Sequence, residues 1–257
     1  PWVDAHAHIC SSEMPLDPRL LASHAAQNGC CRLVEVATDL ASLEKAQRLQ
    51  EQFPWVALAA AVTPHEAADY DPRYLDQIET LARTGSLQAI GETGLDYFHW
   101  KHTEQAQKRL AARQLELAAN TGLPLVIHCR DAFEDFFALL DQHYCKHGCW
   151  LPGMLHCFTG SAQEADRLVS QGWLVSISGV VTYKKSEELR QIAARIPANQ
   201  LLIETDAPWL APQSKRGQIN QPTWILETYE VVARLRNVST DALQDQVRKN
   251  LSQLLKS

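Results

Sequence analysis

The sequence lacks the features that would place a protein in the membrane, secreted or strongly basic classes. Its 257 residues contain no run of roughly 18 apolar residues, the length that a membrane-spanning helix requires. No basic segment followed by an apolar stretch opens the chain, so no secretory signal is expected. The net charge is −6, whereas a protein that binds nucleic acid mainly through electrostatics is expected to be basic. Any contact with phosphate groups must therefore be local.

The seven cysteines do not suggest a disulfide framework. Their number is odd, and Cys129 and Cys157 directly follow apolar, strand-like runs. We therefore expect reduced thiols in a cytoplasmic protein. The segment 143–149, HYCKHGC, offers two histidines and two cysteines, but their spacing matches no C-x-x-C zinc ribbon and Gly148 indicates a loop. A zinc cluster in this segment is the less favoured interpretation.

Short apolar runs alternate with longer amphipathic stretches along the whole chain, and 46% of the residues are hydrophobic, enough for one large core. The predicted strands are 3–9, 33–37, 56–62, 88–91, 125–129, 154–158, 174–177 and 201–205. The predicted helices are 16–28, 41–52, 71–83, 103–121, 132–146, 162–171, 186–195, 223–236 and 240–255. Eight strands in strict alternation with helices favour a closed (β/α)8 TIM barrel, which we expect to be a single domain of residues 1–257.

Local signals mark some of the element boundaries. The segments DAFE, 131–134, and SAQE, 161–164, have the pattern of capping boxes, in which each end satisfies a free backbone N–H of the first helical turn. The longest irregular stretch is 208–222. Long loops in compact domains are usually functional, so we expect this one to contribute to a site.

Two histidines, His6 and His8, stand at the end of the first predicted strand. Residues two apart point to the same side of a strand, so both imidazoles are expected to face the barrel interior near its carboxyl-terminal end. A single histidine there is most often a hydrogen-bonded core residue. A pair in this register also fits a divalent ion, since neutral imidazole is the commonest metal ligand. On this motif alone the two interpretations are equally favoured.

Other predicted strands end in residues of the same kinds. Glu92, His128 and His156 stand at the ends of the fourth, fifth and sixth strands. The eighth strand runs into Glu204 and Asp206. Active sites of TIM barrels are built from the carboxyl ends of several strands. We therefore interpret the four histidines, with carboxylates at the fourth and eighth strands, as one ligand set.

Six ligands exceed what one tetrahedral ion needs, so two ions that share a carboxylate fit better. Such ion pairs clamp the attacking and leaving oxygens of a hydrolytic displacement. Nitrogen-rich ligation favours zinc, while the carboxylates also admit magnesium or manganese. The sequence therefore predicts two divalent metal ions per chain.

Six segments carry a resemblance to a known family. They are DAHAHI (4–9), GETGLDY (91–97), LPLVIHCRDA (123–132), LHCFTGS (155–161), ETDAPWLAP (204–212) and RGQINQP (216–222). Together they resemble the TatD family of metal-dependent hydrolases, in particular its bacterial YjjV-type members. The resemblance covers nearly the whole chain and implies an amidohydrolase-like barrel.

The resemblance also implies roles for the ligand residues. One ion would be held by His6, His8, Glu92 and Asp206, and the second by Glu92, His128 and His156. Glu92 and Asp206 would be the catalytic residues, the first as the bridge and the second by deprotonating a metal-activated water. The family implies phosphodiester hydrolysis, typically deoxyribonuclease activity from a 3′ end, in a cytoplasmic setting. The expected partner is DNA or another phosphodiester substrate, and no obligate protein partner is indicated.

Two positions depart from the family pattern. Near the third strand the family usually has a His-Pro pair, but the segment AVTPHEA places Thr63 there, with His65 two residues further on. If the replaced imidazole contacts phosphate, the affinity for substrate or its identity changes. Thr93 stands where the family usually has an aliphatic residue. We expect this change to be mild because Thr93 lies on the face opposite to Glu92.

Two arginines are the predicted substrate-binding residues. Arg130 follows His128 by two residues, so its guanidinium is expected either to bind a phosphate or to form a structural salt bridge. Arg216 matches the family's RG…NxP pattern. For Asp96, a role as a turn residue or N-cap is favoured over a role in orienting a metal ligand. For Glu204, two roles are equally favoured: orienting a ligand histidine, or serving as a hydrogen-bonded strand carboxylate. Trp209 and Trp224 could stack a nucleobase, but core packing is the favoured interpretation for each.

A second hypothesis keeps the metal site and changes the substrate. The same chemistry serves an amide or acyl-ester hydrolase acting on a small or aminoacyl compound. The negative net charge and Thr63 favour this alternative, whereas Arg130 and Arg216 favour a phosphate substrate. A non-enzymatic metal-binding scaffold is the least favoured reading because the ligand set is complete and includes Asp206 as the candidate base.

Overall fold

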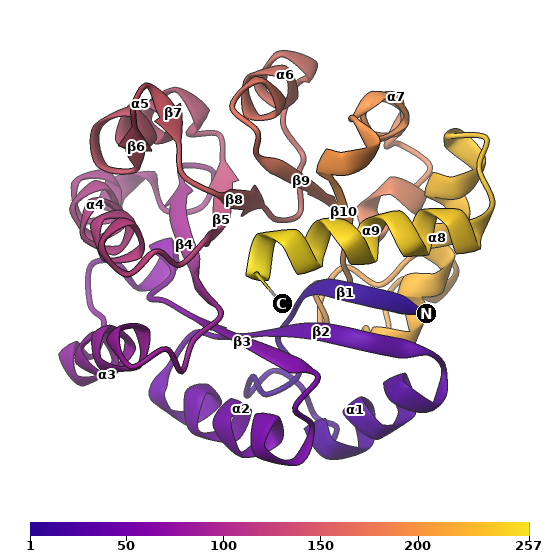
Figure 1. Ribbon diagram of the computed structural model, residues 1–257, viewed down its shortest axis with the longest axis horizontal. Helices are drawn as coiled ribbons and strands as arrows, with labels where there is room; N and C mark the ends of the chain where they lie inside the picture. The colour runs from indigo at the N-terminus through magenta and orange to yellow at the C-terminus, as the bar shows by residue number, and fades with distance from the viewer. Residues whose placement is uncertain (257) are drawn as a thin grey trace.

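The computed structural model describes residues 1–256, in which eight strands form one parallel sheet around a common axis (Figure 1). In sheet order the strands are β1 (Trp2–Ala7), β2 (Cys30–Ala37), β3 (Val56–Ala60), β4 (Ala89–Asp96), β5 (Leu125–Arg130), β8 (Gly153–Leu155), β9 (Leu174–Ile177) and β10 (Leu201–Ile203). Each strand is parallel to its neighbour in this order. The predicted TIM barrel is confirmed.

Helices surround the barrel and cover the outer face of the sheet, apart from the last, which crosses one end of the barrel (Figure 1). They are α1 (Pro18–Gln27), α2 (Leu40–Gln52), α3 (Pro72–Arg83), α4 (Glu104–Thr121), α5 (Phe133–His143), α6 (Ala162–Ser170), α7 (Glu187–Arg195), α8 (Ile225–Leu235) and α9 (Thr240–Leu255). The strands are buried between these helices and the barrel interior, which explains why they read as nearly continuous apolar runs.

The barrel is closed between β1 and the chain that follows β10. The Asp206 N–H donates to the carbonyl of His6 at 2.9 Å, and the His8 N–H donates to the carbonyl of Ala207 at 2.7 Å. The buried carboxylate of Asp4 adds to this seam, since it accepts hydrogen bonds from the Thr205 hydroxyl at 2.6 Å and the Thr205 N–H at 2.9 Å. The closure therefore fixes the first and last ligand-bearing segments against each other.

Helix α9 crosses one end of the barrel, next to β1 (Figure 1). The Asn250 side-chain amide donates to the carbonyls of Ala198 and Leu201, and Leu201 is the first residue of β10. The helix therefore lies at the amino-terminal ends of the strands. The opposite end, where the strands finish, is left for the functional site.

One predicted helix ends earlier than expected. The prediction extended the helix of 132–146 to residue 146, but α5 ends at His143 and a short antiparallel pair follows, β6 (Cys145–Lys146) and β7 (Cys149–Trp150). His147 and Gly148 between them have φ of 54° and 78°. Two positive φ values are the mark of a tight hairpin turn, and glycine at the second position makes this turn accessible.

The capping predictions had mixed outcomes. The box of Ser161 and Glu164 at α6 is confirmed. The prediction at 131–134 is wrong, because α5 begins after Ala132 without a side-chain cap and Asp131 has φ of 54°. A further box, Asp39 with Ser42 at α2, escaped prediction because serine replaces the usual glutamate at the third helical position.

Candidate metal centre

The carboxyl ends of five strands bring six polar side chains together. His6 lies in β1, Glu92 in β4 and His128 in β5, and the other three follow the ends of β1, β8 and β10. The full set is His6, His8, Glu92, His128, His156 and Asp206. Five of these residues are buried, and the His128 side chain is 19% exposed. The barrel thus gathers ligands from positions 200 residues apart in sequence.

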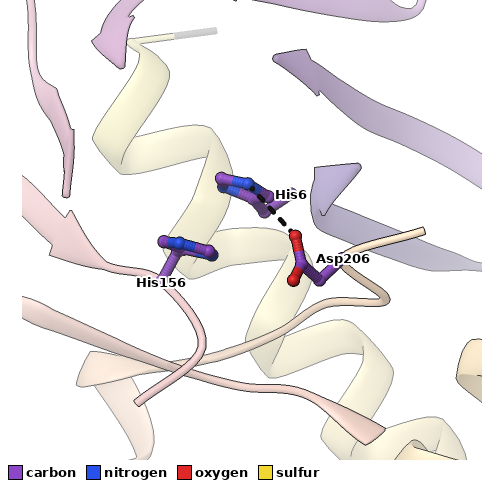
Figure 2. Close-up of side chains that lie close together, drawn as sticks. All are labelled: His6, His156 and Asp206. Carbon is purple, nitrogen blue, oxygen red and sulfur yellow. Dashed lines mark ion pairs between the residues drawn. The ribbon is translucent and has the colours of Figure 1, made fainter. Parts of the chain in front are cut away.

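The first half of the cluster contains the two histidines of the opening motif. Nε2 of His6 lies 2.8 Å from Nε2 of His8. Both nitrogens face Oε2 of Glu92, at 3.4 and 3.2 Å, and Oδ1 of Asp206, at 3.6 and 3.5 Å. Figure 2 shows Asp206 beside His6, while the ring of His156 stacks on the His6 ring with centroids 3.8 Å apart. Four donor atoms therefore converge on one point.

The second half uses the other oxygen of the same carboxylate. Oε1 of Glu92 lies 3.1 Å from Nδ1 of His128 and 3.1 Å from Nε2 of His156. These two nitrogens are 3.4 Å apart. Glu92 therefore directs one oxygen to each half of the cluster, which is the geometry of a bridging ligand.

The separations within the cluster fit bound ions. Ligand bonds of 2.0–2.1 Å around a tetrahedral ion place neighbouring donor atoms about 3.3 Å apart. The observed separations run from 2.8 to 3.6 Å. A donor set of imidazole nitrogens and carboxylate oxygens suits a divalent transition ion. The residues present therefore fit divalent metal binding.

Outer hydrogen bonds fix which nitrogen three of the four histidines offer. Nδ1–H of His8 donates to the carbonyl of Val36 at 2.8 Å, and Nδ1–H of His156 donates to Oε1 of Glu204 at 3.2 Å. Nε2–H of His128 donates to Oδ2 of Asp96 at 3.0 Å. In each ring the other nitrogen points into the cluster. Glu204 and Asp96 are therefore placed to orient the candidate ligand histidines. From the sequence, this role and a structural role were equally favoured for Glu204, whereas a turn role was favoured for Asp96.

The electrostatics of the cluster also suit cation binding. Burial acts to raise the pKa of Glu92, but the nearby His156 and hydrogen bonds from His128, His156 and His6 hold it well below its usual value. Burial and the neighbouring His156 lower the pKa of His6 to about 3. Burial likewise acts to lower the pKa of His8, but hydrogen bonds to Asp206 and Glu92 raise it to about 10. The bridge is thus ionised, and a metal ion would replace a proton at His8.

Close backbone approaches hold the ligands in place. At Gly94, φ is 139° and an added Cβ would lie 1.9 Å from the carbonyl oxygen of His128. Asp206 has φ of 57°, a left-handed conformation that aspartate tolerates better than most residues. Residues in this conformation often occur at functional sites, where the surrounding structure fixes them.

A cleft of about 1160 Å³ opens above the cluster. Its lining includes Arg130 together with Thr63, His65 and Trp209. Arg130 is the only lysine or arginine among the described residues that line it, and its guanidinium lies 3.9 Å from the centre of the Phe98 ring. The predicted position of Arg130 in a cleft thus agrees with the structure.

Three other residues discussed from the sequence, Arg216, Trp209 and Thr93, differ in their relation to this cleft. Arg216 is not among the residues that line the cleft, and its guanidinium lies 4.6 Å from the centre of the Tyr183 ring. Trp209 is 42% exposed at the cleft, so the expectation that it packs in the core is wrong. Thr93 accepts a hydrogen bond from Gln114 of α4 at 2.7 Å, on the outer face as expected.

The segment HYCKHGC does not form a metal site among the described residues, because its histidines and cysteines belong to no group of converging ligand atoms. Cys145 and Cys149 are both exposed on the hairpin. A feature missed by sequence reasoning is the gathering of His65 and His99 around Asp96. The motif GLDYFHW contained Asp96 and His99, but only the fold brings His65 to them.

A TIM barrel with buried histidines and carboxylates at the carboxyl ends of its strands defines a metal-dependent hydrolase. The chain belongs to the family described as TatD related DNase, whose family model matches residues 3–256, and the predicted resemblance is confirmed. No helix within the described residues is long and apolar enough to cross a membrane.

Individual relatives agree with this assignment. The chain is 31% identical over 254 residues to the metal-dependent hydrolase YabD of Bacillus subtilis, covering 98% of each protein. It is 34% identical over 257 residues to the 3′-5′ ssDNA/RNA exonuclease TatD of Klebsiella pneumoniae, covering 98% of this chain and 96% of that one. The crystal structure of YjjV, a TatD homologue from Escherichia coli, matches with a TM-score of 0.90 at 26% identity, covering 100% of this chain and 98% of that one.

Proposed function

We propose that the chain is a binuclear enzyme that hydrolyses phosphodiester bonds in single-stranded nucleic acid from the 3′ end. The observation that carries this proposal is the division of the Glu92 carboxylate between two groups of ligands. The first ion would be held by His6, His8, Glu92 and Asp206, and the second by Glu92, His128 and His156. Zinc suits this nitrogen-rich set best, and magnesium or manganese would also be accepted.

The residues of the cluster would have different roles in the reaction. Bound divalent ions would supply an acidified water and neutralise charge that develops on the reacting oxygens. Asp206 has a side chain 12% exposed toward the cleft, so it is placed to orient that water and to accept its proton. Glu92 keeps both halves of the site at a fixed separation. The buried His6 excludes bulk water from the inner side of the cluster.

Features of the cleft support a nucleic-acid substrate. Arg130 offers a guanidinium that can bind a phosphate in a bidentate manner. Its stacking on Phe98 and the exposed indole of Trp209 provide flat surfaces on which bases can stack. The names of the TatD relatives as ssDNA/RNA exonucleases agree with this substrate. We propose further that residues 1–257 form one hydrolase domain that works in the cytoplasm.

A specific observation favours the alternative of amide or acyl-ester hydrolysis. Away from the metal ligands, the cleft is lined by the exposed carboxylates of Glu13, Asp39 and Glu66, which disfavour a polyanion on that side. A small or aminoacyl substrate would tolerate these groups. Arg216 remains a proposed substrate-binding residue only for a long chain, because it does not line the cleft.

A paired assay distinguishes the two substrates. The metal-loaded enzyme is given a 5′-labelled single-stranded DNA oligomer and, separately, a small acyl ester. We expect 3′ shortening of the oligomer, and Arg130→Ala is expected to raise KM for it roughly tenfold through the loss of a phosphate contact. Arg83→Ala, at an exposed helix end, is the control. Turnover of the ester alone would overturn the proposal in favour of the alternative.

A further inference from the structure

Oxygen Oδ2 of Asp96 is surrounded by three imidazoles. It lies 3.0 Å from Nε2 of His128, 3.2 Å from Nε2 of His65 and 3.4 Å from Nδ1 of His99. The other oxygen, Oδ1, accepts the His99 backbone N–H at 2.9 Å. A carboxylate oxygen has two lone pairs, so three N–H donors exceed its capacity. Ordinary hydrogen bonding therefore does not explain why three rings converge on one atom.

The environment of this oxygen suits a cation. The Asp96 side chain is 1% exposed, while those of His65 and His99 are 38% and 50% exposed toward the solvent. A buried carboxylate with solvent-accessible imidazoles beside it is a typical donor set for a divalent transition ion.

We propose that a third divalent metal ion binds on the wall of the cleft, held by Oδ2 of Asp96, Nε2 of His65 and Nε2 of His128. These three atoms lie within 4.8 Å of one another. Two of their separations, 3.0 and 3.2 Å, fall in the range found in the buried cluster. The ion is of the zinc class because two of the three donors are imidazole nitrogens. This inference rests on the proposed binuclear site, since His128 is shared with it.

Because His128 would serve two ions, the proton on its Nε2 and the charge of the third ion both have to be accounted for. Nδ1 of His128 faces Glu92, and its Nε2–H donates to Asp96. Coordination at Nε2 replaces this proton, which passes to the solvent, and His128 then binds as an imidazolate between two ions. The charges of the imidazolate and of Asp96 together balance a divalent ion. Three protein donors leave one tetrahedral position open to the cleft for water or a substrate oxygen.

The exposed position of His65 gives a clean test. The wild-type protein and His65→Ala are saturated with zinc, freed of unbound metal by rapid gel filtration, and analysed for metal content. His24→Ala is the matched control because His24 is an exposed histidine of α1. We expect His65→Ala to hold one ion fewer per chain than the wild type and His24→Ala to match the wild type.

The design separates this inference from the proposed function. The expected difference of one ion between wild type and His65→Ala does not depend on how many ions the buried cluster holds. A total that falls from three to two supports both proposals, and a fall from one to zero supports only the third site. A crystal of the zinc-loaded wild type should show an anomalous peak between His65 and Asp96. Equal zinc contents, with no such peak, would overturn the inference and leave the three imidazoles as a hydrogen-bonded scaffold.

Discussion

Three of the four ligand histidines donate one ring N–H to a fixed acceptor, and each acceptor lies in a different strand or directly after one. The backbone of Val36 serves His8, and the carboxylates of Glu204 and Asp96 serve His156 and His128. Within residues 1–256, Nδ1 of His6 has no hydrogen-bond partner. The orientation of His6 therefore depends on packing, including the stacked ring of His156. At the residue scale, the ligands are thus held by partners that themselves are buried.

Replacing one of these partners should weaken metal binding without removing a ligand. Glu204→Gln loses the charged acceptor of His156. The affinity for the second ion, which His156 would hold, should therefore fall about 10- to 100-fold. Chelator competition measures this affinity. Glu51→Gln, on the exposed face of α2, is the control and should bind as the wild type does. Equal affinity of Glu204→Gln and the wild type would show that packing alone orients His156.

The proposed proton acceptor makes a separate prediction. Asp206→Asn keeps the size of the side chain but removes its basicity, so kcat should fall about 10²- to 10⁴-fold. The thermal midpoint of the metal-free protein should change little because Asp206 lies at the open end of the barrel. Asp69→Asn, at an exposed loop position, should keep full activity. Near wild-type turnover in Asp206→Asn would rule out this role.

The pH dependence of metal binding follows from His8. Its pKa of about 10 means that the metal-free protein carries a proton there at neutral pH, and a bound ion must displace it. Binding therefore releases at least one proton near pH 7. Each proton released weakens binding by about tenfold for every unit that the pH falls below the pKa. Calorimetry in two buffers of different ionisation enthalpy measures the proton count, and a count of zero would contradict the account.

Sequence reasoning could find the ligands at this scale because they sit at strand ends, where the spacing of two in DAHAHI fixes a common face. It could not predict that three histidines gather around Asp96. His65 reaches Asp96 from 31 residues away, through the short 3-10 helix Pro64–Glu66 after β3. Its placement depends on how two loops pack, which no local pattern encodes.

At the scale of the elements, β4 and β5 pack tightly at Gly94, beside the metal ligands. Gly94→Ala should destabilise the protein because its Cβ would overlap the carbonyl of His128. Gly122→Ala is the control, since it shares a positive φ but has open space around it. Strain alone costs about 1–2 kcal/mol, so Gly122→Ala should lose that much and Gly94→Ala clearly more. Urea unfolding measures both, and equal losses would show that the overlap relaxes without cost.

The bounds of the strands and helices show where prediction from the sequence succeeds and where it fails. Strand β9, predicted and observed at 174–177, is a short, fully buried run in which Ser176 is the one polar residue. Helix α5 ends before its predicted end because Tyr144 is buried, with its hydroxyl 2.9 Å from each of the carbonyl oxygens of Leu123 and Pro152, to one of which it donates. These carbonyls lie just before β5 and β8. A tertiary contact of this kind overrides the helical pattern that continues to Lys146.

At the scale of the whole molecule, the proposed polyanionic substrate has to meet an acidic protein of net charge −6. Arg130 is the one lysine or arginine among the described residues that line the cleft, bound divalent ions would add positive charge at the cluster, and carboxylates line the outer cleft. The eightfold alternation predicted the barrel, but the shape and lining of the cleft arise from loops of several units. The substrate is therefore less predictable from sequence than the reaction centre.

Metal removal should act on the whole fold as well as on the site. The metal-free protein keeps several ionisable groups buried within 4 Å of one another. An ion present at 100 times its dissociation constant stabilises the folded state by about 2.7 kcal/mol. Stripping should therefore lower the thermal midpoint by several degrees, and zinc should restore it. An unchanged midpoint would show that no ion binds preferentially to the folded state.

The most direct test of the binuclear account is metal content combined with activity on one preparation. Protein purified without chelators is analysed for metals, then assayed on a single-stranded DNA oligomer before and after stripping. The account predicts at least two tightly held divalent ions per chain, 3′ shortening of the oligomer, loss of activity on stripping, and recovery when the ions are returned. Protein that holds no metal and gains no activity from added ions would contradict it.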